Sequence, residues 1–313
     1  MSQLGLTAHL ILCYPPSSLH TPTSQKGKRM QRERISDDIF VFTSSLYAQV
    51  TAGAVLTSEG AVIIDTLPFP SETQQIAEFI SKRSSNGICY VILTHYHADH
   101  VYGAYLFRTA QVISHSLCRD WIVQHGQTGL DEARTQTPEL ADAKIRLPDV
   151  VFEGGEMTLR MGNKTLQLLH APGHTQDSIV VYVKEDRILF AADTVMPVPY
   201  IVDGDPKAFI ESLRMIRALS LENVVQGHGE VVLRGEINET IDSSVRYLET
   251  IQAKVAKVIA ADKPREAMRE ISIESCGKSR IPLNGLVQQL HMTNLLSLYN
   301  RSASGGASHK SRK

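Results

Sequence analysis

The sequence has few cysteines and no sign of a disulfide framework. Only four cysteines occur among its 313 residues: Cys13, Cys89, Cys118 and Cys276. A secreted disulfide scaffold or a thiolate zinc site needs closely spaced cysteines, and no C-x-x-C pair is present. Neither class is therefore expected. The sparse cysteine usage suits a reducing compartment, so we predict a cytoplasmic protein.

An excess of one charge and long apolar runs are also absent. The 32 Lys and Arg residues nearly balance the 33 Asp and Glu residues, for a net charge of −1. Nucleic-acid binders usually carry a basic excess, so we expect no nucleic-acid partner. No run approaches the roughly 18 apolar residues of a membrane span, so no membrane partner is expected. The 42% hydrophobic and 21% charged composition is typical of a folded globular protein.

The composition and the hydrophobic pattern of the chain change three times along its length. Residues 1–34 are rich in Ser, Thr, Pro and basic residues without periodicity, and we predict a disordered leader, with Met30 as an alternative start. Residues 35–235 alternate β-branched runs with amphipathic segments, which predicts a layered α/β domain. Residues 236–300 carry apolar residues three and four apart, which predicts a helical region. The Gly/Ser-rich, basic residues 301–313 are expected to form a disordered tail.

Within the α/β domain, buried strands are predicted to end near Asp65, Leu93, His170, Ala191 and Gln226. A helix is predicted from about residue 70 to residue 83, with Ser71 as its N-cap.

One of these strand ends is followed by a dense group of metal-binding residue types. The segment reads Thr94-His95-Tyr96-His97-Ala98-Asp99-His100. Side chains two apart on an extended segment point the same way, so His95 and His97 can share one ion. Asp99 and His100 come after the chain turns toward a helix, and they can reach a second ion beside the first.

Three further candidate ligands follow other strand ends. His174 lies in a Gly-containing loop, Asp193 ends an apolar strand, and His228 is flanked by two glycines. Functional side chains collect on loops that a rigid sheet positions. These residues are therefore expected to form one metal site with His95, His97, Asp99 and His100.

The order of these motifs resembles the metallo-β-lactamase superfamily. HxHxDH is followed by GH, then by a strand-end Asp, then by GHG, over about 200 residues from the strand ending at Asp65 to His228. The resemblance implies an α/β fold, a four-layer αββα sandwich, here with the C-terminal helical region appended. It implies two divalent metal ions: His95, His97 and His174 on the first, Asp99, His100 and His228 on the second, and Asp193 bridging. Asp65 would support the site without ligating.

Nitrogen and oxygen ligands of this kind suit Zn2+, and Fe or Mn is compatible. By resemblance, a metal-bridged hydroxide would cleave an ester, thioester or lactone of a small molecule. Asp99 would also act as a catalytic proton carrier. True β-lactamases usually have Cys or Ser where Asp193 stands, so the chain is closer to the glyoxalase II and lactonase branch.

Substrate contacts are less well defined by the sequence. Tyr200 is a candidate, in the Pro-Val-Pro-Tyr segment after Asp193. Lys278, Arg280 and Arg301 are candidate cationic contacts for a glutathione conjugate. A homodimer is compatible with the sequence, which leaves the oligomeric state open.

Three alternatives to the hydrolase remain. A persulfide dioxygenase shares the motif but uses a single iron ion. A ribonuclease Z-like phosphodiesterase normally carries a basic arm, which is not evident here. A non-catalytic metal-binding sensor would bind metal without turnover.

Overall fold

The computed structural model describes residues 30–310, with side chains described through Ser302. The leader expected over residues 1–29 lies outside this range, as do residues 311–313. No helix within the described part combines the length and the apolar character that crossing a membrane requires.

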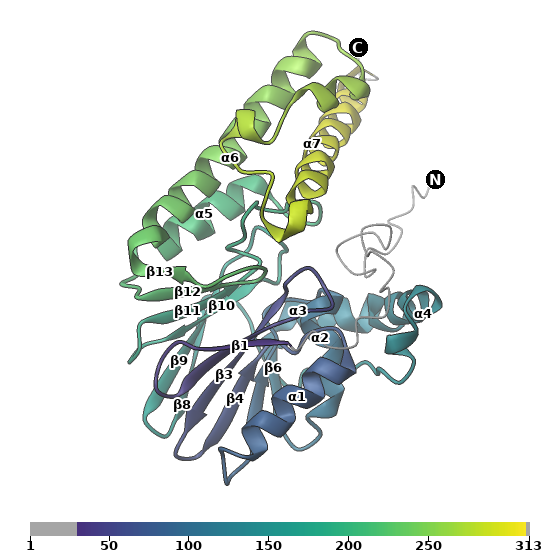
Figure 1. Cartoon of the computed structure of the whole chain (residues 1–313). Helices are drawn as coiled ribbons and strands as arrows, with labels where there is room; N and C mark the ends of the chain where they lie inside the picture. Colours follow the sequence, from purple (N-terminus) through teal and green to yellow (C-terminus); the bar gives the residue numbers. More distant parts are fainter. Residues whose placement is uncertain (1–29, 311–313) are drawn as a thin grey trace.

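Two mixed β-sheets form the centre of the molecule (Figure 1). The first sheet has the order β1-β2-β3-β4-β5-β6-β7, and its strands are Gln31–Arg34, Ile39–Thr43, Thr51–Thr57, Gly60–Ile64, Ile88–Ile92, Gln111–His115 and Val150–Phe152. The second has the order β13-β12-β11-β10-β9-β8, and its strands from β8 to β13 are Glu156–Met161, Lys164–His170, Ile179–Val183, Ile188–Ala192, Asn223–Gln226 and Val232–Leu233. Apolar side chains from both sheets form one core between them, including Ile39 and Val62 from the first and Leu168 and Phe190 from the second.

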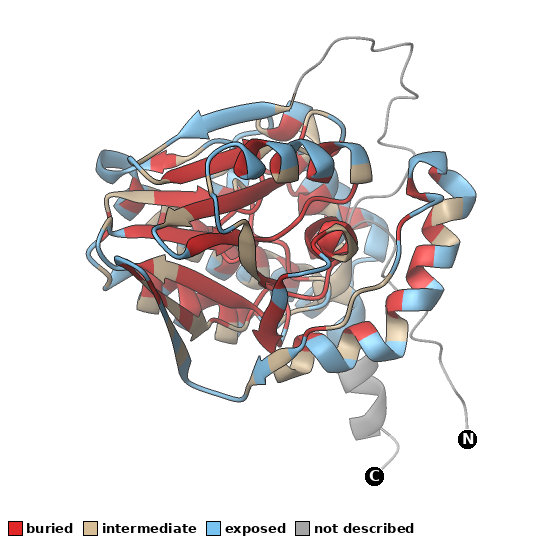
Figure 2. Ribbon diagram, turned by 90° about the horizontal axis from the view of Figure 1, so that it is seen from below, coloured by how far each residue is buried: buried red, intermediate tan, exposed pale blue. Residues whose placement is uncertain are grey.

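Helices cover the outer face of each sheet. The first sheet is covered by α1 (Pro70–Ser81), α2 (Ala98–Val101), α3 (Ser116–Trp121) and α4 (Gln127–Gln136). The second is covered by α5 (Pro206–Arg217), α6 (Arg234–Ala260) and α7 (Val287–Lys310). The predicted four-layer αββα sandwich is therefore confirmed. Figure 2 shows the buried residues concentrated on the strands and on the loops that leave them.

The C-terminal helices share a core with the second sheet. Phe209 of α5, Leu248 of α6 and Leu295 of α7 belong to one buried cluster with Leu189 of β11. In Figure 1 the three helices lie together above the second sheet. The helical region predicted over residues 236–300 is therefore continuous with the α/β layers. Between α6 and α7, this helical region contains a short 3-10 helix over residues 265–270.

Several local predictions differ from the structure. Gln31–Arg34, expected to belong to a disordered leader, is an exposed edge strand paired with β2. Its sequence QRER has no apolar residue that could indicate a strand. Ser71 does not cap α1, because the helix begins one residue earlier at Pro70, whose missing N–H suits the first helical position. The tail expected from residue 301 begins inside α7, so Arg301 is helical.

Candidate metal centre

The seven predicted ligands lie together at one edge of the sandwich, in two adjacent groups. The first group holds His95, His97, His174 and Asp193, and the second holds Asp99, His100 and His228. Within each group the potential ligand atoms all lie within 4.8 Å of one another, and all seven residues are buried.

The division of the HxHxDH motif between the groups follows from its backbone. The chain leaves β5 in an extended conformation, and His97 is the extended N-cap of the short helix α2. His95 and His97 therefore project toward the same group. The turn into α2 then carries Asp99 and His100 to the second group.

The first group is a cluster of three imidazoles and one carboxylate. His97 Nδ1 lies 3.1 Å from His95 Nε2 and 2.9 Å from His174 Nε2. Asp193 Oδ2 lies 3.3 Å from His174 Nε2. Burial lowers the pKa of His95 well below its usual range and lowers that of His174 to about 4. Both imidazoles are therefore neutral, which is the form that ligates a metal.

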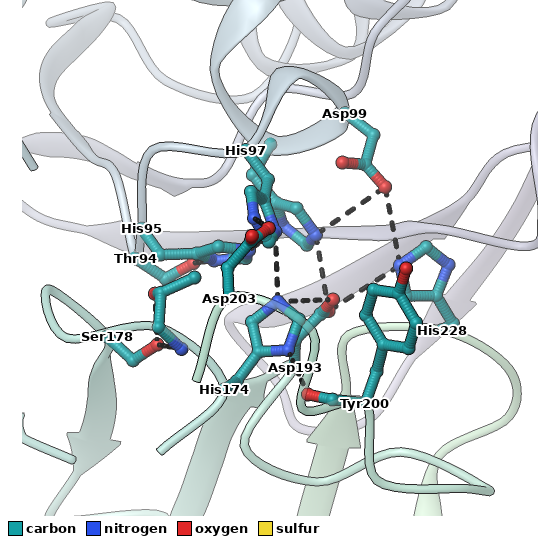
Figure 3. A network of polar contacts seen from close by, with 12 residues as sticks. Thr94, His95, His97, Asp99, His174, Ser178, Asp193, Tyr200, Asp203 and His228 are labelled. Carbon is teal, nitrogen blue, oxygen red and sulfur yellow. Dashed lines mark hydrogen bonds and ion pairs between the residues drawn. The ribbon is translucent and has the colours of Figure 1, made fainter. Parts of the chain in front are cut away.

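Asp193 also faces the second group. Its Oδ1 lies 3.2 Å from His100 Nε2 and 3.5 Å from His228 Nε2, while Oδ2 faces His174 (Figure 3). Asp99 Oδ2 completes the second group at 3.3 Å from His228 Nε2. The carboxylate of Asp193 thus lies between the two groups, one oxygen toward each.

The second group binds protons strongly when no metal is present. Burial alone would lower the pKa of His228, but the carboxylates of Asp193 and Asp99 outweigh it and raise the pKa to about 9. The same balance, with Asp65 contributing, raises the pKa of His100 well above its usual range. Positive charge is therefore favoured at the position where a cation would bind.

The donor set fits divalent metal ions. Each of the five histidines uses its outer ring nitrogen on a protein oxygen and turns the other nitrogen inward. These outer contacts are His95–Thr94 Oγ1 (3.1 Å), His97–Asp203 Oδ2 (3.3 Å), His100–Asp65 Oδ2 (2.8 Å), His174–Tyr200 O (2.9 Å) and His228–Ala48 O (2.9 Å). Such outer contacts are typical of metal-ligating histidines. His100 Nε2 and Asp193 Oδ1 are buried without a hydrogen bond of good geometry, as atoms reserved for a metal would be.

Asp65 lies behind the ligands, where it supports them. Its Oδ1 accepts from the Thr94 N–H at 2.9 Å, and its Oδ2 accepts from Thr94 Oγ1 at 2.7 Å. The same Oδ2 contacts His100 Nδ1, so one carboxylate fixes both the start of the motif and its last histidine.

The other candidates have mostly internal roles. Tyr200 is buried, and its ring centroid lies 6.1 Å from that of His174. Lys278 Nζ donates to the hydroxyls of Ser243 and Ser244 at 2.9 and 3.0 Å, and Arg280 pairs with Glu274. Arg301 donates to main-chain carbonyls of residues 201, 202 and 204. All three predicted cationic contacts are thus engaged by protein groups.

Sequence reasoning missed Asp203, whose carboxylate contacts His97. No local signal marks it, because the contact joins residues 106 positions apart.

Comparison with known proteins identifies the family. The model of the metallo-beta-lactamase superfamily matches residues 47–248. The chain belongs to this superfamily. It is similar to a hydroxyacylglutathione hydrolase of Rhodopseudomonas palustris, with 29% identity over 196 residues, 62% of this chain and 63% of that protein. A beta-lactamase-like protein 2 homolog of Caenorhabditis elegans is 24% identical over 205 residues, 65% of this chain and 63% of that protein. The chain thus matches less than two thirds of the length of these relatives.

Solved structures share the superfamily fold. A metallo-beta-lactamase from Pontibacter korlensis superposes with a TM-score of 0.57 at 22% identity, covering 68% of this chain and 98% of that one. The sec-alkylsulfatase Pisa1 from Pseudomonas sp. has a TM-score of 0.68 at 15% identity, covering 87% of this chain and 50% of that one. The chain therefore combines a metal-binding superfamily fold with His/Asp clusters suited to divalent metals.

Proposed function

We propose that this chain is a metallo-hydrolase that binds two divalent ions, preferably Zn2+, and cleaves an ester, thioester or lactone of a small molecule. The observation that carries the proposal is the Asp193 carboxylate, which directs one oxygen toward each of the two candidate ligand groups. His95, His97 and His174 would hold one ion, and Asp99, His100 and His228 the other. Two adjacent divalent ions supply a Lewis acid and a water of lowered pKa.

The protein's own residues set the charge and exclude solvent. Only two carboxylates, Asp99 and Asp193, face two divalent ions, so the loaded site keeps a net positive charge. Such a site stabilises the negative charge that develops on the substrate oxygen during acyl transfer. All the ligands are buried, so bulk water competes weakly for that charge.

Asp99 is the proposed proton carrier. Its Oδ2 lies 3.3 Å from His228 and 3.9 Å from His100. Nearby histidines hold the pKa of Asp99 below its usual value although burial opposes them. The carboxylate is therefore ionised, which is the form that would accept a proton from the attacking water and deliver it to the leaving group.

Similarity to hydroxyacylglutathione hydrolases supports a thioester among the substrates. The engagement of Lys278, Arg280 and Arg301 by protein groups weighs against a glutathione conjugate, which those cations were expected to bind. We therefore propose the bond class and leave the acyl and leaving groups to experiment.

A substrate panel tests the proposal. Purified protein is assayed with aryl and alkyl esters, lactones, a glutathione thioester and an alkyl sulfate, beside His97→Ala and Asp193→Ala. Hydrolysis that both variants lose supports the proposal. Two bound ions without any turnover would favour the sensor. One iron ion per chain, with oxygen consumption on a persulfide, would favour the dioxygenase.

A further inference from the structure

The loop Pro199–Asp205 touches two histidines of the first ligand group. The main-chain oxygen of Tyr200 accepts from His174 Nδ1 at 2.9 Å, and Asp203 Oδ2 lies 3.3 Å from His97 Nε2. In both histidines the opposite ring nitrogen faces the first group. The loop therefore sets the orientation of two of the three imidazoles. Figure 3 shows Asp203 and Tyr200 at the first group, beside His97 and His174.

The loop is pressed directly against the segment that carries His174. The Asp205 N–H donates to the Gly173 carbonyl at 3.0 Å. A Cβ atom on Gly204 would lie 1.8 Å from that same carbonyl oxygen, so only glycine fits there. A displacement of the loop would therefore be transmitted to His174 by contact.

Two side chains of α7 hold this loop from the other side. Asn294 is fully buried: its Oδ1 accepts from the Ile201 N–H at 3.0 Å, and its Nδ2 donates to the Pro199 carbonyl at 2.7 Å. Arg301, two helical turns further on the same face, donates to the carbonyls of Ile201 and Gly204 at 2.8 and 2.7 Å. Side chains of α7 thus satisfy main-chain groups on both sides of Tyr200 and on both sides of Asp203.

We infer that Asn294, Arg301 and Asp203 are positioning residues for the first metal ion, through which the C-terminal helix sets the affinity of that ion. Asp203 accepts the His97 Nε2–H, which fixes the tautomer and makes Nδ1 the ligating atom. Arg301 and Asn294 hold the loop so that Asp203 and the Tyr200 carbonyl meet the two rings. The histidines of the second group make their outer ring-nitrogen contacts elsewhere, His100 with Asp65 and His228 with the Ala48 carbonyl. The inference rests on the metal binding proposed above.

The test is metal affinity measured on the full chain by competition with a chelator. Asp203→Asn and Arg301→Gln are each expected to lower the affinity for one of two Zn2+ ions by about 10–100-fold, which is the usual effect of losing a contact that orients a ligand. The affinity for the second ion should change by less than about threefold. The visible spectrum of the Co2+-loaded protein should change in both variants. In the double variant the combined loss should be smaller than the product of the two single losses, because both act through one loop.

Two control variants separate positioning from stability. Asp205→Asn alters the same loop, but its carboxylate caps α5 through the Ala208 N–H and touches no ligand. Arg280→Gln removes another cation of the C-terminal region that bonds Glu274. Both controls are expected to keep both metal affinities, even where the Tm falls.

Three results would overturn the inference. Unchanged affinities in Asp203→Asn and Arg301→Gln would do so. So would an equal loss at both ions, or an equal loss in the Asp205→Asn control. A wild-type chain that binds no metal would instead refute the proposed function.

Discussion

Gly227 is the residue whose substitution most directly probes the placement of Asp193. A Cβ atom at this position would lie 1.9 Å from Asp193 Oδ1 and 2.7 Å from the main-chain N of Asp193. Ordinary contact begins at 3.4 Å, so the carboxylate oxygen would have to move by about 1.5 Å. That oxygen is the one that lies 3.2 Å from His100 Nε2.

The magnitude follows from how the added strain is relieved. Inserting a methyl group into a closely packed site typically costs about 1–3 kcal/mol. If the fold keeps Asp193 in place, this energy is lost from the free energy of unfolding. If the carboxylate moves away, the same energy appears in metal affinity, as a loss of about 5–150-fold at 1.4 kcal/mol for each factor of ten.

The assay measures both quantities for Gly227→Ala: Zn2+ affinity by chelator competition, and thermal unfolding with and without metal. Gly235→Ala is the matched control, because no atom lies within 4 Å of its Cβ position and it stands inside α6. The control should keep its metal affinity and gain slightly in stability. A Gly227→Ala protein with both wild-type affinity and wild-type Tm would refute the placement of Asp193.

Four other results are expected. Asp65→Asn should weaken Zn2+ binding about 10–100-fold, because Asp65 holds Thr94 and His100; equal affinity by chelator competition would contradict this. Metal affinity should rise with pH up to about pH 9, because His228 must release its proton to ligate; calorimetry in two buffers measures the protons released, and none at pH 7 would refute it. In the metal-free protein, pH acts on fold stability with the opposite sign to its effect on metal affinity. The raised pKa of His228 stabilises the fold fully below its unfolded value near 6.5, and this contribution is lost as pH rises through about 9, which Tm against pH will show. Chelation should also lower the Tm of the loaded protein, since metal binds the folded state.

The proximity of the seven candidate ligands was predictable because the sequence places them together or at strand ends. Four candidate ligands lie within six residues, Asp193 directly follows an apolar strand, and His228 follows another after one glycine. The strands β11 and β12 are neighbours in the second sheet, so their ends lie together, and the packing of the two sheets brings the end of β5 to the same edge.

The supporting contacts were not predictable, because they join distant parts of the chain. Asn294 and Ile201 are 93 residues apart, and Arg301 and Gly204 are 97 apart. Charge alone marked Arg301 as a substrate contact, whereas the structure gives its guanidinium to main-chain carbonyls. Strand β1 was missed because its charged residues form an exposed edge that no apolar pattern accompanies.

The central claim is that two ligand groups share Asp193, and metal stoichiometry tests it most directly. The full chain is purified without added metal and loaded with Zn2+, and bound metal is measured by elemental analysis beside His97→Ala and Asp193→Ala. We expect about two ions in the wild type, a loss centred on one ion for His97→Ala, and weakened binding of both for Asp193→Ala. A wild type that binds at most one ion, or an Asp193→Ala protein that keeps two with unchanged affinity, would contradict it.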